Sequence, residues 1–318
     1  MGAALALAER GRGRTAPNPN VGCVLMRDGR VVGRGWTQRG GRPHAEAMAL
    51  AEAGARAAGA TCYTTLEPCV HPSPRGPACA DLLIAAGVAR VVAALRDPDP
   101  RTDGAGLARL AAAGVEVRVG VGADMARRSM AGFLTRRALG RPFITLKLAT
   151  SLDGCIALAS GESRWITGPE ARAHAHLERS RCEAILVGRG TWEADAPRLD
   201  VRLPGLEARG PRRVVLSASP VVDDGSVTWL ASPAAIATLP ATDHLLVEGG
   251  AATAAAFIAA DLVDRLLLYR APILIGGGLP ALGDIGLGCL ADAHGRWRLH
   301  DARALGSDRL EVYDRVRA

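Results

Sequence analysis

Four residues of the first eighty have the types and the spacing of a catalytic metal site. His44 and Glu46 stand two positions apart at the start of an apolar-periodic helix, and Cys69 and Cys79 follow in "LEPCVHPSPRGPAC". A catalytic zinc takes three protein ligands from imidazoles and thiolates and keeps a fourth position for water. His44, Cys69 and Cys79 supply that set, which predicts one zinc per chain.

The residues beside these ligands fit a proton-transfer reaction. Glu46 is placed to carry protons without binding the metal, and Pro68 holds Cys69 at a strand-to-helix turn. A helix N-terminus near Cys79 favours the thiolate that a metal requires. His-x-Glu followed by Pro-Cys is the signature of zinc-dependent base deaminases, in which hydroxide attacks an amino-bearing ring carbon.

Each part of the pattern has an ordinary alternative. A lone His-x-Glu is usually a helix cap followed by a solvated acid, and two cysteines ten residues apart are usually unrelated. His71 competes as a ligand, although its proline-rich loop favours a substrate contact. A structural zinc needs a fourth protein ligand, for which only His71 or Cys62 is near. The order of helix, strand, Pro-Cys and Cys-helix favours the catalytic site.

The elements that must position these residues form two α/β domains. In the first half we predict helices over 3–10, 44–58, 78–86, 104–113 and 122–139, and strands over 21–26, 30–36, 61–66, 88–95 and 115–119, which suits a layered domain with a mixed sheet. In the second half we predict strands at 142–151, 183–188, 212–217 and 244–248, a helix at 169–180, then a tight turn, a helix and further strands. The Gly140-Arg141-Pro142 stop divides the chain into predicted domains 1–140 and 141–318.

Composition and charge limit the classes of partner. No apolar run approaches the roughly 18 residues of a membrane span, and the seven cysteines are too few for a disulfide framework, so we expect a cytoplasmic protein without a membrane partner. Residues 1–140 hold 19 Arg against 11 acidic residues, and we expect them to attract an anion. They contain only three aromatic residues, which favours a small phosphorylated substrate over nucleic acid.

Longer stretches of both halves resemble one known family. "TAPNPNVGCVL", "PHAEAMAL", "TLEPCVH" and "ACADLLIAAGVARVVAALRDPDP", followed by "ITLKLATSLDGCIALASGESRWITG", resemble the bifunctional deaminase/reductases of riboflavin biosynthesis. The resemblance runs over nearly the whole chain. It implies an α/β chain with a cytidine-deaminase-like, three-layer N-terminal domain and a C-terminal domain with a fold like dihydrofolate reductase.

The resemblance also implies two reactions on small phosphorylated pyrimidines. The first is the zinc-dependent hydrolytic deamination of a 2,5-diamino-6-ribosylamino-pyrimidinone 5'-phosphate. The second is the NADPH-dependent reduction of the ribosyl chain of the resulting aminouracil to ribityl. In the deaminase pocket it places Asn18 and Asn20, whose amides can read a pyrimidine edge. The loop between Cys69 and Cys79, which carries Arg75, differs from the usual form in the family.

The reductase half has no complete Gly-x-Gly-x-x-Gly fingerprint, but Gly249 and Gly250 precede a helix and let the backbone approach a phosphate. The resemblance makes this turn the pyrophosphate site of NADPH. To the cofactor it assigns Ala149, Trp165, Thr191, Asp195, Gly249, Gly250, Ala251, Ala252 and Thr253, and to the substrate Ser163, Arg179, Leu199, Arg202 and Glu248. Arg179 and Arg202 suit a clamp on a phosphate, although an ordinary surface charge is the alternative for each.

Lys147 is the single lysine among 39 basic residues. An ammonium is compact, whereas a guanidinium is a wide planar fork. The resemblance places the strand of Lys147 beside the nicotinamide and the sugar, so we predict that this ammonium acts in the reduction by binding a sugar oxygen or carbonyl. The alternative is that one lysine persisted by chance.

Two other classes of function remain open from the sequence. A nucleic-acid deaminase with an appended domain would share the zinc site but would leave "GESRWITG" and the glycine turn unexplained. A zinc-stabilised binding module without catalysis would need the fourth ligand. We expect the bifunctional enzyme, acting on small molecules as a homo-oligomer and without a nucleic-acid partner.

Overall fold

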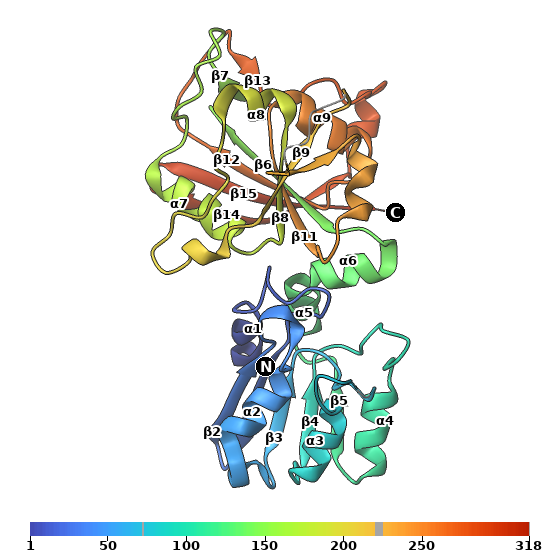
Figure 1. Cartoon of the computed structure of the whole chain (residues 1–318). Helices are drawn as coiled ribbons and strands as arrows, with labels where there is room; N and C mark the ends of the chain where they lie inside the picture. Colours follow the sequence, from blue (N-terminus) through green and yellow to red (C-terminus); the bar gives the residue numbers. More distant parts are fainter. Residues whose placement is uncertain (72, 220–224, 318) are drawn as a thin grey trace. The chain divides into compact units, whose positions relative to one another are not determined.

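A five-stranded sheet and an eight-stranded sheet lie at the centres of two separate units, Met1–Gly140 and Arg141–Ala318 (Figure 1). The computed structural model describes residues 1–71, 73–219 and 225–317. Within the described residues, no helix is both long and apolar enough to cross a membrane.

The sheet of unit 1 is mixed and has the order β2-β1-β3-β4-β5. Strand β1 is antiparallel to β2 and β3, whereas β3, β4 and β5 are parallel to one another. The strands are β1 (Gly22–Arg27), β2 (Arg30–Trp36), β3 (Thr61–Thr64), β4 (Arg90–Ala93) and β5 (Glu116–Val119). The helices are α1 (Gly2–Ala8), α2 (Ala45–Ala53), α3 (Cys79–Ala85), α4 (Ala105–Ala112), α5 (Ala123–Ser129) and α6 (Ala131–Leu139), with 3-10 turns η1 (Arg39–Gly41) and η2 (Gly54–Ala57).

Close helix-to-strand contacts make unit 1 a three-layer structure. A Cβ added to Gly35 of β2 would lie 2.0 Å from the backbone oxygen of Ala45 in α2, so this strand must have glycine where α2 crosses it. A Cβ added to Gly22 of β1 would lie 1.9 Å from the backbone oxygen of Ala4 in α1. Gly22 precedes Cys23, the partner of Gly35, and successive residues of a strand point to opposite faces. Helices α1 and α2 therefore cover opposite faces of the sheet.

The helix that we predicted over 122–139 is divided in two. Helix α5 ends at Ser129 and α6 begins at Ala131, because Met130 departs from helical geometry. The Asn20 side-chain amide donates to the Ser129 carbonyl, and the Met130 side chain is fully buried in the core. A tertiary contact thus takes the carbonyl that the helical ladder would use. The predicted helix over 44–58 is also shorter, since α2 ends at Ala53.

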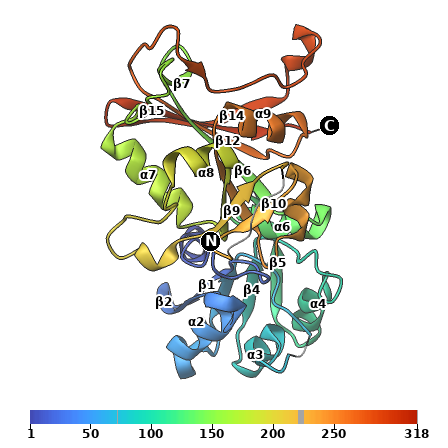
Figure 2. The same ribbon diagram turned by 45° about the horizontal axis from the view of Figure 1, so that its top comes forward.

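The sheet of unit 2 has the order β10-β9-β8-β11-β6-β12-β15-β14. The first six strands are parallel to one another. Strand β15 is antiparallel to β12, and β14 is antiparallel to β15. Figures 1 and 2 show β15 and β14 continuing the sheet beyond β12. The strands are β6 (Phe143–Thr150), β7 (Cys155–Ala157), β8 (Ala184–Gly188), β9 (Arg212–Leu216), β10 (Thr228–Leu230), β11 (His244–Glu248), β12 (Arg265–Arg270), β13 (Leu279–Pro280), β14 (Trp297–Leu305) and β15 (Asp308–Arg315). The helices are α7 (Pro169–Arg179), α8 (Arg189–Asp195) and α9 (Ala251–Ala259), with 3-10 turns η3 (Glu207–Arg209), η4 (Pro233–Thr238) and η5 (Leu290–Ala293).

Both faces of this sheet are buried, as a central parallel sheet requires. On one face, Leu146 of β6 and Phe257 of α9 belong to the same apolar core. On the other face, Tyr269 of β12 packs with Ala171 and Ala175 of α7. Helix α7 therefore covers the face toward which Tyr269 points.

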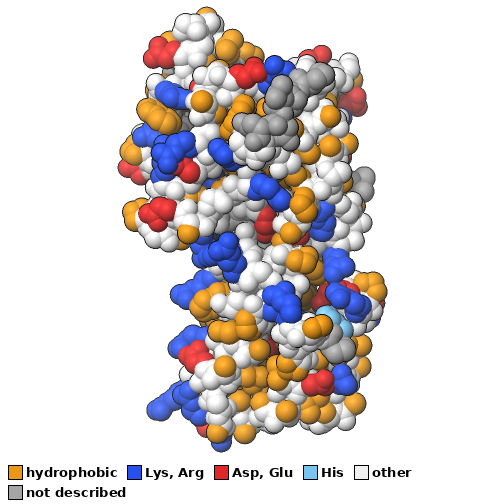
Figure 3. All heavy atoms as spheres, in the orientation of Figure 1, with side chains coloured by type: hydrophobic (Ala, Val, Ile, Leu, Met, Phe, Trp, Pro, Cys, Tyr) orange, Lys and Arg blue, Asp and Glu red, His pale blue; other side chains and the backbone are white. Residues whose placement is uncertain are grey.

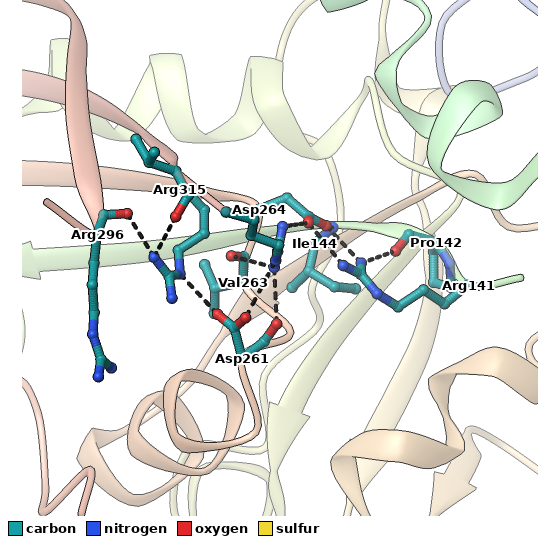
Figure 4. Close-up of polar contacts among 10 residues, drawn as sticks. Arg141, Pro142, Ile144, Asp261, Val263, Asp264, Arg296 and Arg315 are labelled. Carbon is teal, nitrogen blue, oxygen red and sulfur yellow. Dashed lines mark hydrogen bonds and ion pairs between the residues drawn. The ribbon is translucent and has the colours of Figure 1, made fainter. Parts of the chain in front are cut away.

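A buried ion-pair network secures the first residues of unit 2. Arg141 Nη1 and Nη2 donate to the two carboxylate oxygens of Asp264 at 2.7 and 2.9 Å, and the Ile144 backbone N–H donates to the same carboxylate (Figure 4). From the other end of the unit, Arg317 Nη1 donates to Asp264 at 2.6 Å. The two ends of unit 2 are thus held by one carboxylate.

Candidate functional site

Three possible metal ligands meet in unit 1 where its elements begin or end. His44 is the N-cap residue of α2, Cys69 follows β3, and Cys79 is the first residue of α3. His44 Nδ1 lies 3.3 Å from Cys79 Sγ and 3.6 Å from Cys69 Sγ. Tetrahedral zinc separates a nitrogen and a sulfur ligand by about 3.5 Å. The donor set and its spacing therefore fit zinc.

A fourth protein ligand is not found among the described residues. The group of His44, Cys69 and Cys79 includes neither His71 nor Cys62. His71 Nδ1 lies 3.5 Å from the Thr102 hydroxyl, and Cys62 is buried against Cys23. Three ligands suit a catalytic rather than a structural zinc site.

The neighbours of the ligands hold them in place. The Asn18 amide lies 3.1 Å from His44 Nε2 and also donates to the Gly41 carbonyl, so it fixes the plane of the imidazole. The Cys79 backbone N–H donates to Cys69 Sγ at 3.4 Å. A hydrogen bond from the Cys79 thiol and, after it, one from His44 lower the pKa of Cys69 to about 3 despite burial. Cys69 is thus favoured as the thiolate.

Glu46 lies within the same site as a buried acid. Its carboxylate accepts a hydrogen bond from the Thr64 hydroxyl at 3.2 Å, and the residue is 3% exposed. Burial is the largest influence on its carboxyl and raises the pKa above its ordinary value. The side chain is fixed beside the ligands without belonging to their group.

A cavity beside these residues is lined by Asn18, His44, Glu46, Cys69 and His71. Asn20, which we expected there, is not among its lining residues. The Asn20 amide instead donates to the Ala8 carbonyl and to Ser129, where it joins α1 to the end of α5. The Asn-Pro-Asn turn therefore presents its first amide to the cavity and turns its second into the fold.

Five charged residues of the cavity wall were not predicted. They are Glu67, Asp97, Asp99, Arg101 and Arg137. Burial raises the pKa of Asp97 to about 6, whereas hydrogen bonds from Arg101 hold the pKa of Asp99 below its ordinary value. Asp97 and Asp99 follow a strand in "LRDPDP", which is a usable sequence signal, but nothing local indicates that Arg137 of α6 reaches the same cavity.

In unit 2, three predicted residues form one charged cluster. Arg179 of α7 donates through Nε and Nη2 to the Glu248 carboxylate at 2.7 and 2.9 Å, and Lys147 Nζ lies 3.7 Å from Glu248 Oε2. Burial alone would raise the pKa of Glu248, but the charges of Lys147 and Arg179 outweigh it and lower the pKa to about 2. The Arg179 guanidinium is therefore bound to Glu248, and its Nη1 also donates to the Asp200 carbonyl.

The other residues expected at the substrate are placed differently. Arg202 Nε donates to Asp200, and 55% of the Arg202 side chain is exposed. Leu199 is buried in an apolar cluster with Ile185, so only its backbone can reach a ligand. Ser163 is exposed in the loop before α7.

A cradle of small residues stands where β8 and β11 end. Gly250 is the N-cap of α9, and no side chain caps the first turn. A Cβ on Gly250 would have only the Thr191 hydroxyl near it, at 3.8 Å, whereas one on Gly249 would lie 2.9 Å from Thr253 Cβ. Free N–H groups at a helix N-terminus bind phosphate. The open space at Gly250 therefore fits a cofactor phosphate over the first turn of α9, which consists of Ala251, Ala252 and Thr253.

The remaining residues expected at the cofactor lie on β6, on α8 and in the loop before α7. Ala149 of β6 is half-buried opposite Tyr269 of β12. Trp165 is 66% exposed, with the Arg172 guanidinium 4.7 Å from its ring centre. Asp195 pairs with Arg164 at 3.1 Å. An exposed indole at this position leaves a face for a ligand.

Comparison with known proteins identifies both units. Residues 1–95 match the family model of the cytidine and deoxycytidylate deaminase zinc-binding region, and residues 142–310 match that of the RibD C-terminal domain. The chain is 42% identical to riboflavin biosynthesis protein RibD of Escherichia coli, over 97% of this chain and 96% of that protein.

Two solved structures agree over the whole chain. The structure of Acinetobacter baumannii RibD has a TM-score of 0.89 at 35% identity and covers 100% of this chain and 98% of its own. The Thermotoga maritima diaminohydroxyphosphoribosylaminopyrimidine deaminase/5-amino-6-(5-phosphoribosylamino)uracil reductase has a TM-score of 0.88 at 32% identity, covering 99% and 97%. The predicted pairing of a cytidine-deaminase-like domain with a reductase domain is confirmed.

Proposed function

The chain belongs to the family of bifunctional deaminase/reductases of riboflavin biosynthesis, and on that premise we propose that residues 1–140 catalyse the deamination and residues 141–318 the reduction. A zinc-dependent deaminase and an NADPH-dependent reductase therefore lie on one chain. The match of the zinc-binding family model to the first unit supports the division. The observation that carries the proposal is the three-ligand group beside buried Glu46.

For the deamination, His44, Cys69 and Cys79 hold the zinc. As a Lewis acid, the ion makes water a nucleophile near neutral pH. Glu46, aligned by Thr64, moves a proton from that water to the departing amino group. Asn18 and His71 line the cavity and contact the pyrimidine ring. Burial of Glu46 keeps bulk water from competing for its proton.

For the reduction, NADPH supplies a hydride. The glycine cradle and the first turn of α9 bind its pyrophosphate, while Ala149, Trp165, Thr191 and Asp195 contact the rest of the cofactor. Lys147 binds an oxygen of the sugar chain, and Glu248, which is itself held by Arg179, keeps the ammonium in position. Ser163, Leu199 and Arg202 contact the rest of the substrate.

The substrates are small phosphorylated pyrimidines, in line with the two activities for which the Thermotoga relative is named. We further propose a homo-oligomer, because unit 2 exposes large apolar side chains along one stretch of chain: Ile273, Leu274, Leu279, Leu287, Leu290 and Leu299. The seven cysteines are free, which supports a reducing compartment, the cytoplasm. Sedimentation of the purified protein tests the oligomer.

One incubation tests the whole proposal. The purified full-length protein is given zinc and 2,5-diamino-6-ribosylamino-pyrimidinone 5'-phosphate, with and without NADPH, and the products are separated. We expect ammonia and the aminouracil without NADPH, and the ribityl product with it. Formation of no ammonia from this substrate would contradict the deaminase assignment, and an unreduced sugar chain would contradict the reductase assignment.

A further inference from the structure

Two guanidinium groups converge on one carboxylate in the wall of the deaminase cavity. Arg101 Nε and Nη2 donate to Asp99 at 3.0 and 2.6 Å, and Arg137 Nη2 donates to Asp99 Oδ2 at 2.6 Å. Arg101 comes from the loop after β4 and Arg137 from α6, so these two segments meet at Asp99. The Asp99 side chain is only 6% exposed, which fixes the meeting point.

The two arginines lie toward solvent, whereas the reactive end of the cavity is buried. The Arg101 and Arg137 side chains are 61% and 39% exposed, and Glu46 is 3% exposed. All three line the same cavity. A pyrimidine that reaches Glu46 with its amino-bearing carbon must direct its substituent toward the mouth, where the arginines are.

The arginines retain hydrogen-bond donors for a ligand. Their two positive charges face the carboxylate of Asp99, and Asp97 is a further acid of the same wall. Within the described residues, the Nη1 group of each arginine has no protein acceptor, and Arg137 is further steadied by its stacking on Phe133. Guanidinium groups held in a fixed orientation are the donors that phosphate prefers.

Arg75, in the loop between Cys69 and Cys79, is placed less favourably than these two arginines. Arg75 Nη2 donates to the Gly40 carbonyl, and Arg75 is not among the residues that line the cavity. Arginines are spread over the face of unit 1 that forms the lower part of Figure 3, but among the described residues Arg101 and Arg137 are the arginines that line the cavity.

We propose that Arg101 and Arg137, held together by Asp99, form the subsite of the deaminase cavity that binds the substrate's phosphate. The proposal rests on the proposed deaminase function and adds the residues that select a phosphorylated over an unphosphorylated pyrimidine. Asp99 is a positioning residue, because it touches the two guanidinium groups and sets the direction of their remaining N–H groups.

The test compares the pyrimidinone 5'-phosphate with the nucleoside obtained by removing its phosphate. Ammonia release gives kcat/KM for both, in the wild-type full-length protein and in Arg101→Gln, Arg137→Gln and the double variant. We expect the wild type to prefer the phosphate by roughly 100-fold or more, and each single change to lower that preference about tenfold. The nucleoside rate should stay within about twofold, and Arg→Lys at either position should restore part of the preference.

Arg127→Gln is the matched control, since Arg127 is an exposed arginine that pairs with Asp124 on α5. Zinc content measures folding of each variant, and a variant that loses zinc is replaced by its Lys counterpart. The proposal would be overturned if the Arg→Gln variants lost kcat/KM equally on both substrates or lost it on neither. It would also be overturned if the wild type did not prefer the phosphate. A wild type that deaminates neither substrate would instead overturn the proposed function.

Discussion

At the scale of single residues, two acids of the deaminase cavity are held in different states. Burial raises the pKa of Glu46, and ion pairs with Arg101 and Arg137 keep Asp99 charged. An acid with a raised pKa can both accept and return a proton near neutral pH. Glu46 is therefore suited to proton transfer, and Asp99 to holding cations.

Replacing Glu46 with Gln keeps its size and its contact with Thr64 but removes proton transfer. We expect Glu46→Gln to retain one zinc per chain and to lose ammonia release by at least roughly 100-fold. Metal analysis and an ammonia assay on the same preparation measure both. Glu52→Gln on the same helix, where the side chain is exposed and pairs with Arg34, is the control. Unimpaired deamination by Glu46→Gln would remove Glu46 from the mechanism.

Replacing Lys147 with Arg should affect the reductase alone. Both oxygens of Glu248 already accept hydrogen bonds from Arg179, so a second wide guanidinium has to displace one. We expect a reduction rate at least roughly tenfold lower, about 1.4 kcal/mol of transition-state stabilisation, with unchanged deamination. Arg181→Lys, which exchanges the same two residue types just after the end of α7, is the control. A near-normal rate of NADPH oxidation would show that the reduction does not require Lys147, and that this lysine persisted by chance.

Residue spacing was sufficient to predict the ligand group but not the whole cavity. His44, Cys69 and Cys79 are identified because metal chemistry restricts residue type and order. Asn20 and Asn18 stand in one turn and look equivalent, yet only Asn18 lines the cavity. Arg137 could not be predicted, because its place depends on where α6 packs and not on its neighbours in the chain.

At the scale of elements, Glu67 joins the ligand loop to α4. Its two carboxylate oxygens accept backbone N–H groups of Asp97, Gly104, Gly106 and Leu107, at 2.8 to 3.2 Å. The residue is buried and stands two positions before Cys69. One carboxylate therefore caps a helix and sets the loop that carries a zinc ligand.

Glu67→Gln should loosen this connection, because an amide cannot accept at both of its ends. We expect the free energy of unfolding to fall by about 1–3 kcal/mol and zinc to pass faster to a chelator. Urea unfolding and the rate of zinc transfer to a coloured chelator measure the two effects. Glu116→Gln, at a side chain that is 65% exposed, is the control. If Glu67→Gln released zinc at the wild-type rate, the loop would be held by other contacts.

The acid Glu183, which lies where the parallel strands β8 and β11 begin, makes stability depend on pH. Glu183 accepts the backbone N–H of His244, the first residue of β11, and burial followed by the charge of Asp243 raises its pKa from 4.5 to about 7. Between these values the folded chain keeps the proton that the unfolded chain releases. The contribution of Glu183 to the free energy of unfolding therefore falls as pH rises from about 4.5 to about 7 and is level above.

Glu183→Gln imitates the protonated acid at every pH. We expect wild type and variant to have similar free energies of unfolding at pH 5, and the variant to be more stable at pH 8 by up to roughly 3 kcal/mol. Urea unfolding followed by circular dichroism from pH 5 to 8 measures the difference. Glu207→Gln, an exposed site, should follow the wild type. A Glu183→Gln curve parallel to the wild type would contradict the raised pKa.

Element positions followed from apolar periodicity and Gly/Pro stops wherever local signals agreed with packing, as in β1, β2 and α7. The division of the helix over 122–139 could not be predicted, because Asn20 is far from Ser129 in the sequence and its side chain takes a backbone carbonyl there. The short helix α8 is not predicted from the sequence, since its seven residues carry no apolar repeat.

At the scale of the whole molecule, Arg141 lies just beyond the end of unit 1. Its side chain is 11% exposed and that of Asp264 is 6% exposed, so this ion pair belongs to the interior of unit 2. Leaving a buried carboxylate with fewer partners is costly. The first residue of unit 2 is therefore part of its stability and not part of a linker.

Dividing the gene between residues 140 and 141 should yield two folded pieces, because each unit has its own buried core. We expect piece 1–140 to bind zinc and deaminate, and piece 141–318 to oxidise NADPH with the aminouracil. A piece that begins at Pro142 lacks the Arg141 partner of Asp264, and its free energy of unfolding should be lower by roughly 2 kcal/mol or more. The midpoints of urea unfolding of pieces 140–318, 141–318 and 142–318 measure this difference. The first two pieces both keep Arg141 and serve as matched controls. Equal midpoints for all three would show that Arg317 alone satisfies Asp264, and two unfolded pieces would show that the units depend on each other.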